Sequence, residues 1–341
     1  MIDEIIPIGW RSRPIVRLLV GFSIPTLFAA AIVADMLAAQ TPPVSDVPPQ
    51  IRGVADQEPI TPIPPPPAVD PRKRALGERL FSDVRLSAKG DFACSSCHDL
   101  RTNGAGGRAA KKGPAGASPG NGNPPLDTLS AFNASLSFRL DWEGGFRTLT
   151  AQAEASIENP SSMDTDVATV ASKLAADPDI AGQFFAAYGR EPDRDNVLDA
   201  LTTFERTLLT PGSRFDRWLD GDAAALSADE LEGYRLFKSF GCSSCHQGVN
   251  IGANLFQRQG VFRQLVRTGP KVVRVPSLRN VATTAPYFHD GSAATLEEAV
   301  SRMAAAQLDR TLTDQQVGLL VAFLKTLTGN YRGSPVVGAA P

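Results

Sequence analysis

Histidine and cysteine are scarce in this chain of 341 residues, which contains 3 of the first and 4 of the second. Aromatic residues make up only 7%, and the alternation of polar and apolar residues that is typical of strands is hard to find. A net charge of -2 argues against a protein that binds nucleic acid through a basic surface. Apolar residues, at 43%, suffice for buried cores, and Ala-rich segments of helical spacing predict an all-α fold.

The N-terminal part of the chain differs in composition from the rest. Three arginines precede an uncharged run, Leu18–Ala34, and small residues suited to a cleavage site follow. This pattern over residues 1–40 is typical of a signal peptide or of an uncleaved membrane anchor, and both imply export to the periplasm. Residues 41–71 are rich in proline, which predicts an extended linker without a core of its own, so the packed structure is expected to begin near Arg72.

A repeated motif divides the remainder into two similar parts. "GERLF" (77–81) precedes "CSSCH" at 94–98, and "GYRLF" (233–237) precedes "CSSCH" at 242–246. The repeat predicts an internal duplication, with one helical domain over 72–222, a second over 223–332 and a tail over 333–341.

Several residues mark where helices begin and end in these two parts. Ser227, Thr295 and Thr313 are each followed three residues later by Glu or Gln, the capping-box spacing that marks the start of a helix. Gly329 is the expected C-cap of the last helix. Residues 167–209 are expected to form two or three more.

Three kinds of site compete for the C-x-x-C-H pattern. A zinc ribbon needs a second cysteine pair about 15 to 20 residues away, and a dithiol redox site accompanies a βαβ unit, but this chain has neither. In the third kind, covalent c-type haem, two thiols bind the vinyl groups and the adjacent histidine ligates the iron. Two such motifs that use every cysteine predict two haem c groups, attached at Cys94, Cys97, Cys242 and Cys245, with His98 and His246 as iron ligands.

Longer segments of the chain resemble the bacterial dihaem cytochrome c peroxidases. "RLDWEGG", "GYRLFKSFGCSSCHQGVNIGANLFQRQGVF" and "VRVPSLRNVATTAPYFHDGSAATLEEAVSRM" carry the resemblance, which covers about 72–330 and extends to relatives in methylamine dehydrogenase maturation. It implies two cytochrome c-like domains with their haems near the domain interface. Electrons from a small cytochrome c or copper protein would enter at the C-terminal haem and reduce hydrogen peroxide at the N-terminal haem. Relatives also suggest a homodimer.

The resemblance assigns roles to single residues of this chain. Met303 matches an axial methionine of the C-terminal haem, although a methionine in a helical stripe with Leu296 and Val300 is also a normal core residue. Trp142 matches a tryptophan that lies between the haems in the family; the alternative interpretation is that it is an ordinary aromatic residue of the core. His289 is implied to be a supporting residue near the interface rather than a ligand.

A calcium site between the domains is also implied by the resemblance. Its ligands would be Asp127, at a position where the family has asparagine, and the carbonyl groups of Thr284 and Pro286. Aspartate is an acceptable oxygen ligand for calcium.

The chain departs from the family pattern at the N-terminal haem. No histidine lies between His98 and His246, so the iron there is expected to be five-coordinate or water-bound unless His289 reaches it; the other candidates are Lys111, Lys112 and Met163. Gln152 matches the glutamine of the family's active site, but the family's acid is replaced by Ser162, which is a weak base.

Ser162 leaves three functions open. The first is a peroxidase, in which Glu154, Glu158 or Asp164 would replace the missing carboxylate. The second is an enzyme that oxidises a protein partner, although its relatives carry tyrosine in place of the axial methionine. The third is a dihaem electron carrier or redox sensor whose peroxide site has degenerated.

Overall fold

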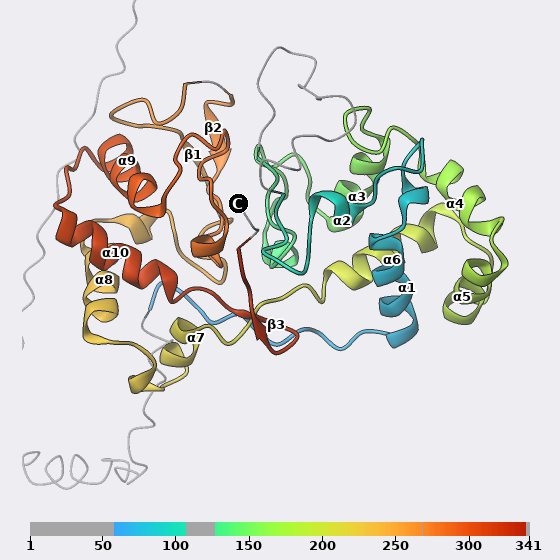
Figure 1. The fold of residues 1–341 in the computed structure, drawn as a ribbon, viewed down its shortest axis with the longest axis horizontal. Coiled ribbons are helices and arrows are strands. Elements are labelled where there is room, and N and C mark those ends of the chain that lie inside the picture. Colours follow the sequence, from blue (N-terminus) through green and yellow to red (C-terminus); the bar gives the residue numbers. More distant parts are fainter. Residues whose placement is uncertain (1–57, 107–126, 268, 339–341) are drawn as a thin grey trace, which may run out of the picture. The chain divides into compact units, whose positions relative to one another are not determined.

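The computed structural model describes residues 58–106, 127–267 and 269–338, and in these the fold is mainly helical, as predicted (Figure 1). Two short antiparallel hairpins are the sheet structure of the described chain. The N-terminal half contains α1 (Pro71–Phe81), α2 (Cys94–Cys97), α3 (Leu149–Glu158), α4 (Val167–Ala175), α5 (Pro178–Tyr188) and α6 (Arg194–Glu205). The C-terminal half contains α7 (Arg214–Leu219), α8 (Ala228–Ser239), α9 (Leu296–Leu308) and α10 (Asp314–Lys325), with β1 (Phe256–Arg258), β2 (Val272–Arg274), β3 (Asn330–Tyr331) and β4 (Ser334–Pro335).

The predicted helix starts are present. Ser227 and Thr313 begin α8 and α10 with complete capping boxes, and the Thr295 side chain accepts a hydrogen bond from the Glu298 amide at the start of α9. The prediction for Gly329 is wrong, because α10 ends at Lys325 and Thr326 is its C-cap. Glycine is required at 329 for another reason, since a Cβ there would overlap the carbonyl oxygen of Thr210.

The two halves use the same helix crossing, which supports the duplication. In the first half α1 packs on α6, and a Cβ at Gly77 would overlap the carbonyl oxygen of Ala200. In the second half α8 packs on α10, and a Cβ at Gly233 would overlap the carbonyl oxygen of Leu319. The glycine of each G-x-R-L-F motif therefore allows two helix backbones to touch.

The proline-rich segment is extended, but it also joins a core. Ile60 is fully buried among residues of the C-terminal half, and the Glu58 carboxylate accepts hydrogen bonds from Tyr234 and Lys238. The packed part of the chain therefore begins before Arg72. At the other end, Val336 packs in a cluster with aromatic side chains of α1 and α6. The segment that precedes the N-terminal half thus packs in the core of the C-terminal half, and the segment that follows the C-terminal half packs on the N-terminal one.

Packing also places α7 with the C-terminal half. Phe215 and Leu219 are fully buried in the same cluster as Tyr234 and Phe323, and Phe215 lies edge-on to both of these rings. In its packing, α7 therefore belongs with the core of the C-terminal half. Between 167 and 209 the structure has three helices, the upper figure that the sequence predicted.

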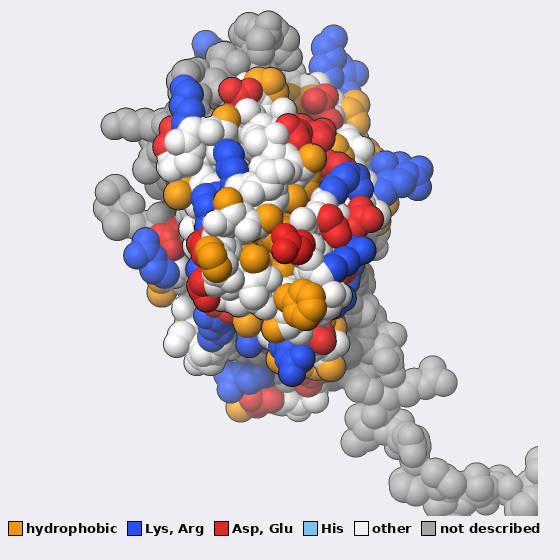
Figure 2. Space-filling view, turned by 90° about the vertical axis from the view of Figure 1, so that its right-hand side faces the viewer, with side chains coloured by type: hydrophobic (Ala, Val, Ile, Leu, Met, Phe, Trp, Pro, Cys, Tyr) orange, Lys and Arg blue, Asp and Glu red, His pale blue; other side chains and the backbone are white. Residues whose placement is uncertain are grey.

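The surface carries both signs of charge in close alternation. Figure 2 shows this on the face that includes α4 and α5, where acidic and basic side chains lie between scattered hydrophobic ones. Ion pairs such as Arg79–Asp179 and Arg190–Asp193 belong to this pattern. Among the described helices, none combines the length and the apolar character needed to cross a membrane. The predicted export segment, residues 1–40, lies outside the described residues.

Candidate active site

Both C-x-x-C-H motifs line one cavity of about 720 Å³, which is large enough for a substantial cofactor. Cys94, Cys97 and His98 border it from the N-terminal half, and Cys242 and His246 border it from the C-terminal half. Cys245 lies beside the hairpin β1–β2, with its Sγ 3.9 Å from Gln257 Nε2. The cavity is lined mainly by apolar groups, as expected for a site that holds a porphyrin.

The two histidines have matching surroundings. His98 Nδ1 lies 3.0 Å from the carbonyl oxygen of Gly104, and His246 Nδ1 lies 3.2 Å from that of Ile251. A carbonyl can only accept, so Nδ1 carries the proton in both rings and Nε2 keeps its lone pair for a metal. Burial lowers the pKa of both imidazoles, that of His246 to about 4, so both are neutral, as an iron ligand must be.

An aromatic ring supports each histidine in the same way. The ring centroids of Phe81 and His98 are 6.4 Å apart, with an angle of 47° between the ring planes. Those of Phe237 and His246 are 6.3 Å apart, with an angle of 51°. These phenylalanines are the last residues of "GERLF" and "GYRLF". The repeated pentapeptide therefore contributes to both helix packing and histidine support.

The cysteines are available for covalent attachment. All four are free thiols in the structure, and each pair is spaced by a short helical turn, α2 in one half and the 3₁₀ turn Cys242–Ser244 in the other. Burial raises the pKa of the Cys94 thiol to about 12 and that of Cys242 to about 11, so neither is disposed to act as a free thiolate nucleophile. Paired thiols, a neutral histidine and an apolar cavity together fit two haem c groups.

A different helix lines the cavity in each half. From α9, the Met303 side chain lines the cavity beside the half-buried Val300. From α3, Gln152 lines it and donates a hydrogen bond of 2.8 Å to the Ser156 hydroxyl. Ser162 and the buried Met163 also border the cavity, whereas Lys111 and Lys112 lie outside the described residues.

The three acidic residues that could have replaced the missing carboxylate are not at the cavity. Glu154 forms a two-pronged ion pair with Arg194, with hydrogen bonds of 2.6 and 2.5 Å. Glu158 and Asp164 are exposed to solvent, and none of the three lines the cavity.

A carboxylate that the sequence analysis did not single out, Glu205 at the end of α6, borders the cavity. Its Oε2 is buried and has no hydrogen-bond partner in the described part of the chain.

Glu205 is expected to make stability depend on pH. Burial raises the pKa of its carboxyl from 4.5 to about 8, so between these values the folded protein holds a proton that the unfolded chain has released. The free energy of unfolding should therefore fall as pH rises from 5 to 8, and Glu205→Gln should reduce that fall by about 2–4 kcal/mol. Denaturant unfolding at both pH values measures it, with the exposed Glu158→Gln as control. Parallel pH profiles for Glu205→Gln and the natural protein would contradict the prediction.

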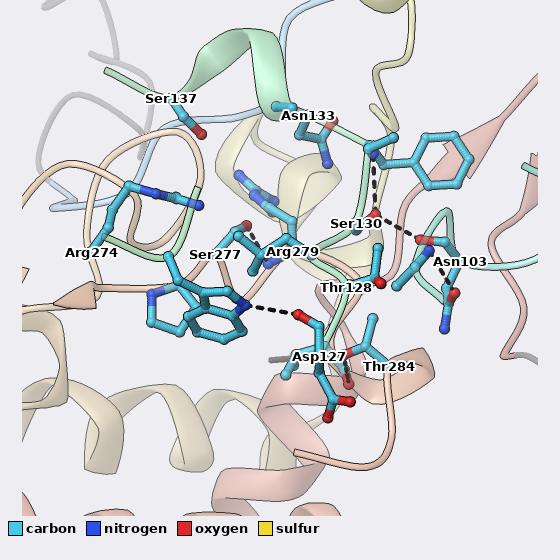
Figure 3. Close-up of a pocket in the computed structure, with 18 of the residues that line it drawn as sticks. Asn103, Asp127, Thr128, Ser130, Asn133, Ser137, Arg274, Ser277, Arg279 and Thr284 are labelled. Atoms are coloured by element: carbon cyan, nitrogen blue, oxygen red, sulfur yellow. Dashed lines mark hydrogen bonds between the residues drawn. The ribbon is translucent and has the colours of Figure 1, made fainter. Parts of the chain in front are cut away.

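The residues between the motifs form a polar contact region. The Trp142 ring lies edge-on to His289, with ring centroids 6.0 Å apart, and Trp142 Nε1 donates to the carbonyl oxygen of Asp127 at 2.8 Å. Figure 3 shows Asp127 beside Thr284. Asp127, Thr284 and Pro286 all line the cavity, so the structure brings together the three residues assigned to calcium. The described residues contain no cluster of three or more His, Cys, Asp or Glu side chains suited to a metal ion.

Two buried arginines of this region were not singled out from the sequence. Arg274 donates to the carbonyl oxygen of Asp141, and Arg279 forms a fully buried ion pair with Asp216 at 2.7 Å. Arg279 also donates to the carbonyl oxygens of Val249 and Thr61. Nothing local in "VPSLRN" signals this pairing, because the partner lies 63 residues away in sequence.

Comparisons with known proteins agree with this site. The family model for di-haem cytochrome c peroxidase matches residues 71–224, and the model for cytochrome c matches residues 231–328. The chain is 39% identical over 295 residues to the cytochrome c551 peroxidase of Nitrosomonas europaea, covering 81% of this chain and 86% of that protein. It is 31% identical to the methylamine utilization protein MauG of Methylorubrum extorquens, covering 75% of this chain and 78% of that one.

A solved structure has a similar fold. It is that of a MauG-like protein associated with microbial copper homeostasis, with a TM-score of 0.66, 28% identity and coverage of 78% of this chain and 93% of that one. Two attachment motifs on one cavity, the repeated helical framework and a relative at 39% identity lead to the same conclusion. The chain belongs to the di-haem cytochrome c peroxidase family and is an oxidoreductase that carries two haem c groups.

Proposed function

We propose that the protein reduces hydrogen peroxide to water with electrons from a small redox protein, either a cytochrome c or a copper protein. The observation that carries this proposal is the difference between the two sides of the cavity. A thioether, Met303 of α9, lines the cavity from the C-terminal half, whereas the amide of Gln152 and the hydroxyl groups of Ser156 and Ser162 line it from the N-terminal half. Methionine ligation raises a haem potential and suits electron entry, while an open position suits substrate binding.

Each residue then has a distinct task. Bound haem supplies an iron that takes up electrons and binds oxygen ligands. His98 and His246 would hold the two irons, Met303 would be a second protein ligand of the C-terminal iron, and Gln152 would orient substrate at the N-terminal one. Trp142 and His289 are in contact with each other between the halves, on the electron path that this proposal requires.

Further proposals concern the setting of the protein. The arginine-flanked apolar segment within residues 1–40 supports export to the periplasm, with or without cleavage. The grouping of Asp127 with Thr284 and Pro286 supports a calcium ion between the halves, held by one carboxylate and by carbonyl oxygens, a hard-oxygen ligand set that Ca²⁺ accepts. A homodimer is proposed from the resemblance alone.

Ser162→Glu tests whether the N-terminal site performs peroxide chemistry. A carboxylate at this cavity-lining position would move a proton between the two oxygens of peroxide, so turnover should rise by about tenfold or more. The assay follows oxidation of reduced cytochrome c after addition of peroxide, with Ser161→Glu, on the exposed neighbouring residue, as the matched control. Fast turnover in the natural protein, without gain from the glutamate, would mean that another group already moves the proton.

A second candidate function, an electron carrier or redox sensor, is favoured by one observation. None of Glu154, Glu158 and Asp164 lines the cavity, so no replacement for the acid lost at Ser162 comes from this stretch. If the natural protein shows no peroxide turnover with several donors and Ser162→Glu restores it, the N-terminal site has lost its peroxide chemistry. Absence of turnover in both proteins would contradict the peroxidase proposal.

A further inference from the structure

The duplication is closest in the segments that lead into α3 and α9. Asn133 and Asn280 are 147 residues apart, and they adopt the same left-handed conformation, with φ of 61° and 60°. At the same separation, Leu140 pairs with Phe146 as Tyr287 pairs with Ala293. Thr148 and Thr295, the N-caps of α3 and α9, continue this register. No insertion or deletion therefore separates the two segments up to the start of the helices.

Contacts between the halves support this register independently. In a twofold repeat, residues near the axis meet their own counterparts. Trp142 and His289 are 147 residues apart, and their rings lie edge-on with centroids 6.0 Å apart. Asn103 and Asn250, also 147 residues apart, each donate to the neighbouring segment of the other half, Asn103 to the carbonyl oxygen of Thr283 and Asn250 to the Ser137 hydroxyl.

The register identifies the counterpart of Met303. Met303 is the eighth residue after the N-cap Thr295, and the eighth residue after Thr148 is Ser156. Helices that begin with the same cap after the same bridged loop present this residue on the same face, slightly more than two turns along. Ser156 and Met303 both line the cavity, as the register requires.

Ser156 is chemically unlike its counterpart. A serine side chain is shorter than that of methionine and lacks the thioether that binds haem iron, so it would leave open the position that Met303 would close in the other half. The Ser156 Oγ accepts a hydrogen bond of 2.8 Å from Gln152 Nε2. Because that bond occupies an oxygen lone pair, the hydroxyl hydrogen remains to be donated to another group.

We propose that Ser156 makes the N-terminal haem the substrate site: it keeps the sixth position open, and its hydroxyl, held by Gln152, donates a hydrogen bond to the oxygen or anion bound there. The inference deepens the proposed peroxidase function and rests on it for the identity of the substrate. The opening of the position and the hydrogen bond do not depend on turnover, so both are tested by spectroscopy and by anion binding.

Ser156→Met tests the open position in the full chain with both haems attached. The new thioether should ligate the N-terminal iron and convert its ferric signal from high-spin to low-spin in electron paramagnetic resonance, with a doubled methionine-to-iron absorption band. Azide binding should weaken by about a hundredfold or more. Ser172→Met, on the exposed face of α4, is the control and should change neither. A folded Ser156→Met protein whose high-spin signal persists would overturn the inference.

Ser156→Ala and Ser156→Thr test the hydrogen bond. The alanine variant should bind azide about tenfold more weakly at an unchanged spin state, and threonine should restore the affinity, because a hydrogen bond to an anion has about this weight. Equal azide affinity in Ser156→Ala and the natural protein would overturn this role. If the natural protein lacked peroxide turnover while Ser156→Met became low-spin, the inference on the site would stand and the proposed function would fall.

Discussion

Replacement of Met303 by alanine is expected to lower the midpoint potential of the C-terminal haem by on the order of 0.1 V, a modest part of the ~0.8 V range that axial ligands span. Met303 lines the cavity from α9, which belongs to the C-terminal half, as do Cys242 and His246. A loss of 0.1 V corresponds to roughly 2.3 kcal/mol per electron, so reduction by the donor should become about fiftyfold less favourable. Redox titration followed by absorption spectroscopy measures the shift.

The control for this prediction is Met163→Leu. Met163 is also buried at the cavity, but in the N-terminal half, and its replacement keeps volume and apolar character. It should leave both potentials and the methionine-to-iron absorption band unchanged. Loss of that band in Met163→Leu rather than in Met303→Ala would assign the thioether ligand to the other half of the molecule.

Asp216→Asn is expected to lower the free energy of unfolding by about 3–5 kcal/mol, because it leaves the Arg279 guanidinium buried without its counter-charge. The side chains of Arg279 and Asp216 are only 1% and 2% exposed, and they lie 2.7 Å apart. Burial already lowers the pKa of Arg279, so the environment penalises its charge. Chemical denaturation of the assembled protein measures the loss.

A surface ion pair supplies the matched control for the buried one. Arg235 and Glu232 lie 3.2 Å apart on α8, with side chains 70% and 45% exposed. Glu232→Gln should lower the free energy of unfolding by less than about 1 kcal/mol, because solvent screens the pair. Similar losses for the two variants would show that Arg279 finds another acceptor or that water reaches it.

Arg279 also explains why the Asp216 variant should affect more than one element. Its guanidinium joins α7, the loop that follows His246, and the N-terminal segment at Thr61. Ile60, next to Thr61, is buried in the C-terminal core. Loss of the ion pair is therefore expected to loosen the N-terminal segment along with the loop that supports the C-terminal histidine.

Predictions from local sequence patterns agree well with the structure. The capping boxes at Ser227 and Thr313 begin helices as expected, and the repeated G-x-R-L-F motif lies at equivalent helix crossings. These features depend on a few neighbouring residues, so their spacing carries the information. Gly329 shows the limit of this reasoning: glycine there serves close contact with Thr210 rather than a helix cap, and both uses look the same in a sequence.

The sequence predicts less well which side chains point into the cavity, because the direction of a side chain depends on partners that are distant in sequence. Glu154 is next to cavity residues in α3, yet it faces outward, because Arg194 of α6 binds it. Glu205 is far from the attachment motifs in sequence and borders the cavity, because α6 packs on α1 and α3. Neither placement follows from residue type or spacing.

The sequence by itself determined that the chain is duplicated and helical, and it predicted where two haem c groups attach and which residue types are missing from the N-terminal site. Those properties reside in contiguous motifs such as C-x-x-C-H, whose chemistry requires no knowledge of the fold. Only the tertiary structure decided that both motifs share one cavity, that Ser156 stands where Met303 stands in the other half, and that Ile60 and Val336 pack across the halves. The physical reason is that packing between distant helices sets which face of each helix meets the cavity.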